Sequence, residues 1–207
     1  MNEETAHRTG VVLTDLDRAG NAGLAPSPAG PITTERFEEE YEKIGWLKGR
    51  HATPEALAQA RDFWRRQGGP GLRWLVARLR QEWHIDALDG VASLLAAAGE
   101  TAILPILEEL ERQPTRDQAG ALLQALAWVG EDGIAATTSL APRLEAVLVS
   151  LRQHDDADLR ERAARSARLL PRAAAVGLLR GWLEGETDAD VRRAIEEVLG
   201  VDATGRI

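Results

Sequence analysis

The sequence predicts an all-α fold, a short right-handed α-solenoid of antiparallel helix pairs with an extended N-terminal tail. The first observation is a repeat: residues 156–160 read Asp-Ala-Asp-Leu-Arg, and residues 188–192, 32 positions later, read Asp-Ala-Asp-Val-Arg. A second echo relates residues 96–103 to residues 127–134, 31 positions later. Repeats of roughly 30–45 residues with helical patterning indicate stacked helix pairs. The third observation is that runs of strand-favouring residues are absent from the body of the chain.

Composition limits the kinds of protein that the sequence can encode. A chain of 207 residues is long enough for about four to five helix pairs. Its net charge of -8 disfavours general affinity for nucleic acid, and the absence of cysteine excludes disulfides and thiolate metal sites. We expect a cytoplasmic protein with no membrane segment, since no apolar run approaches the ~20 residues that a spanning helix needs. The abundance of Ala and Arg and the scarcity of Lys indicate a bacterial source.

The first 31 residues are predicted to form a flexible or extended tail. Three apolar residues, Val11, Val12 and Leu13, are followed by a stretch rich in Gly and Pro that cannot sustain a helix. A flexible segment with an apolar centre can dock on a partner as it orders. Val11, Val12 and Leu13 are therefore candidate partner-binding residues.

Residues 32–84 are predicted to form a basic, Trp-rich helical segment. Thr33 or Thr34 can cap a helix that continues to about Arg50. The triplet Thr53-Pro54-Glu55 is a strong helix start, and Gly68-Gly69 ends that helix. Pro70 opens the next helix, in which apolar residues fall on one face, namely Leu72, Leu75, Val76, Leu79 and Trp83.

Residues 85–200 are predicted to hold the repeats, followed by a short C-terminal tail at 201–207. The first helix of a unit tends to begin with Asp and end at Gly, whereas the second begins near Thr or Pro and is rich in Leu. The first expected helix starts at Asp86 or Asp89 and ends at Gly99. The helical units that follow are expected at 101–113, 117–129, 134–153, 156–170, 171–184 and 188–199. The unit at 134–153 is longer than its neighbours.

The units share a pattern: Asp-x-x-Val/Leu-Arg, then small residues, Leu and finally Gly-Asp/Glu. This pattern resembles the HEAT-repeat family, particularly its short bacterial forms. The resemblance covers about residues 86–200 and is clearest at 156–170 and 188–200. In that family, the loop Asp and the following Arg of each repeat often form a ladder between repeats. The resemblance implies that Asp156 and Arg160 of one repeat, and Asp188 and Arg192 of the next, occupy these positions. The units that end at Gly99 and Gly130 lack the matching Arg.

No pattern of catalytic or metal-binding residues emerges. The four histidines, His7, His51, His84 and His154, do not form pairs at helical spacing. The pair His154-Asp155 precedes a repeat helix, where acids serve as caps. Gly68-Gly69-Pro70-Gly71 lacks the Lys-Ser/Thr of a phosphate loop, and no nucleophile elbow occurs. We expect no catalytic residues, no metal, no cofactor and no enzymatic activity.

Charge and tryptophan concentrate in one segment. Residues 43–83 hold nine basic residues and three acidic ones, a net charge of +6 within a chain of -8, and four of the six tryptophans. Such interleaving favours either nucleic-acid backbones or an acidic protein. Trp64 falls on the apolar face of its helix, whereas Trp74 and Trp46 point away from the apolar faces of their helices. Helical periodicity leaves open whether these two side chains are exposed or packed against another layer. The candidate partner-binding residues of this segment are Trp74, Arg78, Trp46, Arg73 and Arg65.

These observations favour a non-catalytic interaction scaffold, or a small adaptor or regulatory subunit of a bacterial assembly, with a protein partner. The alternative is a nucleic-acid-binding HEAT-like module, which at its extreme would resemble the alkylpurine DNA glycosylases; the acidic repeats disfavour it. A third possibility, a chromophore-lyase subunit of the HEAT-like kind, would need a tetrapyrrole-binding partner.

Overall fold

The computed structural model describes residues 33–47, 54–81 and 85–200, and all regular secondary structure within them is helical. The all-α prediction is therefore confirmed for this part of the chain. The N-terminal tail and its residues Val11, Val12 and Leu13 lie outside the described residues, as do Trp83 and the C-terminal tail. Within the described residues, no helix is both long and apolar enough to cross a membrane.

The N-terminal helices follow the predicted start signals. Helix α1 (Thr34–Leu47) begins after Thr33, whose carbonyl accepts hydrogen bonds from the amides of Arg36 and Phe37 at 3.1 and 3.3 Å. Helix α2 (Pro54–Leu79) begins at the predicted proline.

The predicted break near Gly68 is present as a kink within α2. Gly68 adopts φ 60° and ψ -158°, a conformation that side chains disfavour. The chain turns so tightly here that a Cβ on Gly71 would lie 2.2 Å from the Cβ of Gln67. Glycine at both positions therefore allows the two halves of α2 to change direction.

The remaining helices begin and end close to the predicted positions, except that the unit predicted from 134 becomes helical only at Ala141. They are α3 (Ile85–Ala97), α4 (Glu100–Leu110), α5 (Arg116–Glu131), α6 (Ala141–Leu151), α7 (Ala157–Ser166) with the short 3₁₀ turn η2 (Ala167–Leu169), α8 (Arg172–Leu183) and α9 (Ala189–Leu199). Gly99 and Pro171 occupy the N-cap positions of α4 and α8, and Pro114 lies in the connection before α5. Gly130 does not end α5, which continues one residue further to Glu131.

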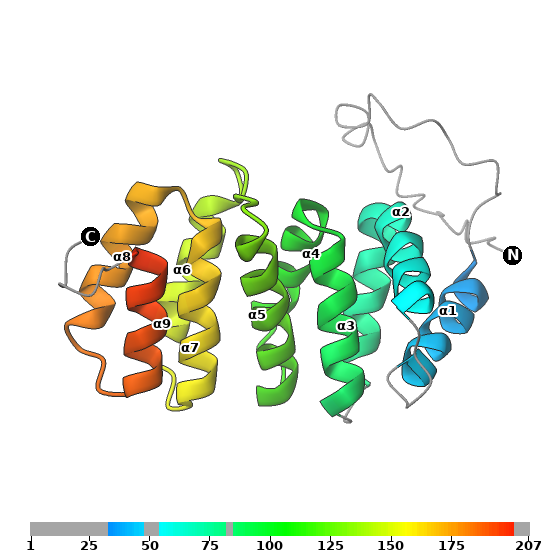
Figure 1. The fold of residues 1–207 in the computed structure, drawn as a ribbon, viewed down its shortest axis with the longest axis horizontal. Helices are drawn as coiled ribbons and strands as arrows, with labels where there is room; N and C mark the ends of the chain where they lie inside the picture. Colours follow the sequence, from blue (N-terminus) through cyan, green and yellow to red (C-terminus); the bar gives the residue numbers. More distant parts are fainter. Residues whose placement is uncertain (1–32, 48–53, 82–84, 201–207) are drawn as a thin grey trace, which may run out of the picture. The chain divides into compact units, whose positions relative to one another are not determined.

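Helices α2 to α9 lie in two layers, and α1 contacts the first helix of each (Figure 1). Helices α3, α5, α7 and α9 contact one another in sequence along one layer, and α2, α4, α6 and α8 do so along the other. The apolar core lies between the layers, where Leu79, Leu95, Ile106 and Leu122 are fully buried. Helices of both layers thus bury their apolar faces against one another.

Arginines join neighbouring units through side-chain contacts. Arg162 donates to the carbonyl oxygen of Gly120 at 2.9 Å, and Arg165 and Arg168 pair with Glu197 and Glu131 at 2.7 and 3.0 Å. The residues in these pairs are 42, 32 and 37 positions apart, about one repeat length. The connections between units are therefore ionic as well as apolar.

The repeated Asp and Arg residues have matching places. Asp156 and Asp188 are the N-cap residues of α7 and α9. The carboxylate of Asp156 accepts from the amide of Leu159, and that of Asp188 accepts from the amides of Asp190 and Val191. Arg160 pairs with Glu186, which precedes α9, at 2.9 Å. Arg192 donates to the carbonyl oxygens of Leu183 and Glu186, both at 2.9 Å. The two arginines thus hold the same connection between α8 and α9.

Replacing Asp188 by Ala is expected to lower the free energy of unfolding by about 1 kcal/mol, because the amides of Asp190 and Val191 lose their acceptor. Urea denaturation followed by circular dichroism measures this loss. The matched control is Asp190→Ala on the same turn, where the carboxylate is exposed and pairs only with Arg193. Equal stability of Asp188→Ala and the unmodified protein would contradict the capping role.

Candidate functional site

A groove of about 590 Å³ lies between α4 and α6. The C-terminal part of α4 supplies Leu110 and Glu111, and α6 supplies Ala146, Val147 and Ser150. The first turns of α5 and α7 complete it with residues such as Ala119 and Leu159. Most of these side chains are aliphatic, so the groove presents an apolar surface.

The connection between α5 and α6 is long, and none of its residues lines the groove. Residues 132–140 join these helices, whereas only Ala98 and Gly99 join α3 to α4. The amide of Ala136 donates to the carbonyl oxygen of Leu169 at 2.8 Å, which holds the connection against η2. Helix α6 buries Leu144 and Leu148 in the core and leaves Ala146 and Ser150 exposed. A small residue at position 146 keeps this part of the groove open.

Ion pairs frame the groove. Arg143 on α6 forms two hydrogen bonds with Glu111 at the end of α4, which lowers the pKa of that carboxyl group. Arg116 bonds to Asp156 and also contacts Asp158 at 3.2 Å, and its hydrogen bond is the main cause of the lowered pKa of Asp156. These charges are satisfied by one another rather than directed into the groove.

His154 lies at the far edge of the groove, in the connection between α6 and α7. Its Nδ1 accepts a hydrogen bond from the amide of Asp156 at 3.0 Å. The imidazole thus supports the connection that leads into α7. Among the described residues, no group of three or more His, Asp or Glu side chains is arranged to hold a metal ion.

His154 also lines a second, more polar pocket of about 450 Å³ between the ends of α6 and α8. Its main polar feature is Glu186, whose side chain is only 4% exposed. This carboxylate accepts two hydrogen bonds from Arg160, one from the indole of Trp182 and two from the amides of Thr187 and Asp188. The hydrogen bond from Arg160 is the main reason that the pKa of Glu186 falls to about 2.

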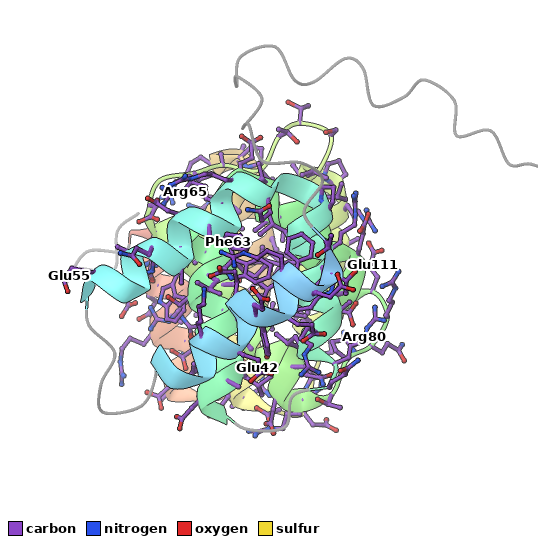
Figure 2. All side chains as sticks on the ribbon, turned by 90° about the vertical axis from the view of Figure 1, so that its right-hand side faces the viewer. Glu42, Glu55, Phe63, Arg65, Arg80 and Glu111 are labelled. Carbon is purple, nitrogen blue, oxygen red and sulfur yellow. The ribbon has the colours of Figure 1, made fainter. Side chains whose placement is uncertain are left out.

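Trp74 packs within an aromatic cluster formed by α1 and α2. Its ring stacks on Trp64 with 5.6 Å between centroids and contacts Phe37 and Tyr41 at 5.4 and 5.9 Å. Phe63 completes the cluster (Figure 2). Trp74 is half-buried, so its place opposite the apolar stripe of α2 reflects packing against α1. Trp46 lies in α1, but its side chain is outside the described residues.

The basic residues predicted to face a partner are paired with residues of the protein itself. Arg73 pairs with Glu108 at 3.2 Å, and Arg65 pairs with Asp62 at 3.3 Å and donates to the carbonyl oxygen of Ala97. Arg78 lies 3.6 Å from Glu38 and stands over the ring of Tyr41.

Arg80 continues this pairing with the acidic end of α4. It binds the buried carboxylate of Glu109 through two hydrogen bonds, which lower the pKa of Glu109. Arg65 and Arg80 project from opposite sides of the α1–α2 end of the structure (Figure 2). Much of the net positive charge that the sequence concentrates in residues 43–83 is therefore neutralised by acidic residues of α1, α2 and α4.

The structure thus separates the candidate residues into two regions. Trp74, Arg78, Arg73 and Arg65 belong to α2, whereas the groove lies between α4 and α6 and contains none of them. The sequence pattern did not single out Ala146, Arg116 or Glu186. No local signal in the sequence marks the groove, because the extra length of the unit at 134–153 lies in the connection before α6, which does not line it.

Comparisons with known proteins identify no relative: no family model, curated protein or solved structure matches the chain.

Proposed function

We propose that this chain is a short right-handed α-solenoid of HEAT-like helix pairs that acts as a non-catalytic scaffold for a protein partner. Its place would be in the cytoplasm, as an adaptor or regulatory subunit of a bacterial assembly. Support for the repeat architecture comes from the two layers of helices and from arginine bridges that span about one repeat length.

The observation that carries the proposed function is the apolar groove between α4 and α6, framed by ion pairs. Helical faces form its walls, and Leu110, Val147 and Leu151 supply aliphatic contacts. A groove of this kind suits the apolar face of an amphipathic helix. The charged side chains at the edge of the groove are already paired with one another. They therefore contribute to the shape and solubility of the groove rather than to ion pairs with a partner.

The ends of the described body favour binding along its side. Helix α1 exposes Glu35, Glu39 and Glu42, and α9 exposes Asp190 and Arg193. Polar outer faces on terminal helices prevent a stack from extending by addition of further copies. A partner that approaches the α4–α6 side meets the apolar groove instead.

The paired state of Arg73, Arg78 and Arg80 favours a protein partner over nucleic acid. A phosphate backbone would have to compete with Glu108, Glu38 and Glu109 for these guanidinium groups. We expect no mobility shift of DNA or RNA at physiological salt. A shift that weakens steeply as salt rises would instead support the nucleic-acid alternative.

Replacing Ala146 by Trp is expected to abolish capture of the native partner, with at least a tenfold loss of affinity, because the new ring fills the groove where the partner would insert its apolar residues. Ala146 is exposed, so the substitution does not require the core to move. The measurement is co-purification from the source organism after cross-linking, followed by mass spectrometry.

The matched control is Ala173→Trp, which adds the same ring at an exposed position of α8 outside the groove. It should capture the same partner as the unmodified protein. A partner that Ala146→Trp retains at full yield would place the binding surface outside the groove.

A further inference from the structure

One arginine of the polar pocket has a side chain without a hydrogen-bond or ion-pair partner in the described part of the chain. Arg152 occupies the C-cap position of α6, is half-buried and lines the pocket between α6 and α8. Among the described arginines, only Arg152 and Arg180 have side chains that form no hydrogen bond or ion pair. This contrasts with Arg116, Arg143 and Arg160, which each bind a carboxylate.

The pocket leaves the guanidinium of Arg152 accessible. Gly181 has no side chain to cover it: a Cβ there would lie 3.9 Å from Nη1 of Arg152. Gly185 lines the same pocket and has nothing within 4 Å of its own Cβ position. A ligand can therefore approach Arg152 along the surface of α8.

The acidic residues of the pocket do not neutralise Arg152. Glu186 is occupied by five hydrogen bonds, two of which come from Arg160. Asp155 is exposed and forms no ion pair with Arg152, although its backbone carbonyl accepts from Arg160. One positive charge thus remains available in a partly desolvated position.

The pocket adjoins the apolar groove, since His154 lines both. A peptide segment that lies between α4 and α6 can therefore extend past His154 to reach Arg152. The two surfaces differ in chemistry, with aliphatic side chains in the groove and an unpaired guanidinium beyond it.

We infer that the partner segment is acidic and amphipathic, with apolar residues for the α4–α6 groove and an adjacent carboxylate that binds Arg152. This inference rests on the proposed function, because it assigns chemistry to the partner of the same groove. Guanidinium groups bind carboxylates through two parallel hydrogen bonds, which gives both strength and a fixed orientation.

The test is a selection of random 12-residue peptides displayed against the full chain. Groove-dependent peptides are those that bind the unmodified protein and are lost on Ala146→Trp. We expect them to be enriched in Asp and Glu and to bind Arg152→Ala about tenfold more weakly, as for loss of a charge-assisted hydrogen bond. Arg180→Ala removes the other unpaired arginine outside the pocket and should leave their affinity unchanged.

A charge reversal gives a second, independent readout. Selection on Arg152→Glu should exchange acidic peptides for peptides that carry Lys or Arg, whereas selection on Arg180→Glu should not. Groove-dependent peptides without acidic enrichment, or with full affinity for Arg152→Ala, would overturn the inference while leaving the groove intact as a binding site. If no selected peptide depends on Ala146, the proposed function itself fails.

Arg152 also has a simpler structural role to be distinguished, since a cation at a helix C-terminus stabilises the helix dipole. That role alone predicts a lower melting temperature for Arg152→Ala with unchanged peptide affinity. The inferred role predicts the reverse: lost affinity at a melting temperature close to that of Arg180→Ala. Circular dichroism on the same protein samples separates the two.

Discussion

Replacing Glu186 by Ala is expected to lower the free energy of unfolding by about 3–5 kcal/mol, because the change leaves a partly buried Arg160 without its counter-charge. The same substitution removes the acceptor for the indole of Trp182 and for the amides of Thr187 and Asp188. These groups hold the connection between α8 and α9. Urea denaturation measures the loss as a fall in the transition midpoint at unchanged slope.

The matched control is Glu184→Ala, two residues earlier in the same connection. Glu184 is exposed and accepts no side-chain hydrogen bond, so its removal should change stability by less than about 0.5 kcal/mol. Similar losses of unfolding free energy for the two variants would show that any Ala substitution in this connection destabilises the protein. They would then contradict the role assigned to the Glu186 carboxylate.

The lowered pKa of Glu186 gives the same contact a pH dependence. A fall from 4.5 to about 2 on folding corresponds to about 3 kcal/mol of stability at neutral pH. Because the folded state holds the deprotonated form, this stability is present above pH 4.5 and is lost as pH falls from 4.5 towards 2. Glu186→Gln cannot ionise, so its stability should fall less over this range than that of the unmodified protein.

Local sequence signals account for most of the helix boundaries. Asp156 and Asp188 precede helices because a short acidic side chain satisfies free amides, and Pro171 precedes α8 because it fixes the backbone at a helix start. Gly130 shows the limit of such signals. Glycine is permitted at a helix end but does not require one, and α5 continues through it to Glu131.

The candidate site depends on contacts that no local pattern contains. The groove exists because α4 and α6, which are 30 residues apart, leave space between them over the first turns of α5 and α7. Glu186 and Glu184 are equivalent as sequence, yet only the first lies within reach of Arg160. Pairing over about one repeat length likewise neutralises Arg73 and Arg80, which the sequence presents as a basic segment.

The exposure of Trp74 was undecidable from the sequence for the same reason. Its place opposite the apolar stripe of α2 is compatible with solvent or with another layer. The structure supplies that layer as α1, through Phe37 and Tyr41. Helical periodicity defines which face a residue occupies, but the neighbour of that face is a property of the tertiary fold.

Replacing Trp64 by Ala is expected to lower the free energy of unfolding by about 3–5 kcal/mol, because it leaves a large cavity at the centre of the aromatic cluster. Trp64 is fully buried and contacts Phe37, Phe63 and Trp74. These contacts connect α1 to both halves of α2. Denaturation followed by circular dichroism measures the loss, since the other tryptophans complicate a fluorescence readout.

Two further variants separate cavity formation from loss of the indole. The Nε1 atom of Trp64 is buried without a hydrogen-bond partner, which is a cost that the folded state already bears. Trp64→Phe removes that polar atom and keeps a ring, so it should cost less than about 1.5 kcal/mol. A loss as large as that of Trp64→Ala would show that the indole has a specific role in the cluster.

Trp74→Ala, at a half-buried position, should cost less than Trp64→Ala. It should also retain the native partner if binding occurs at the α4–α6 groove, whereas a folded Trp74→Ala protein that loses the partner would move the interface to α1 and α2.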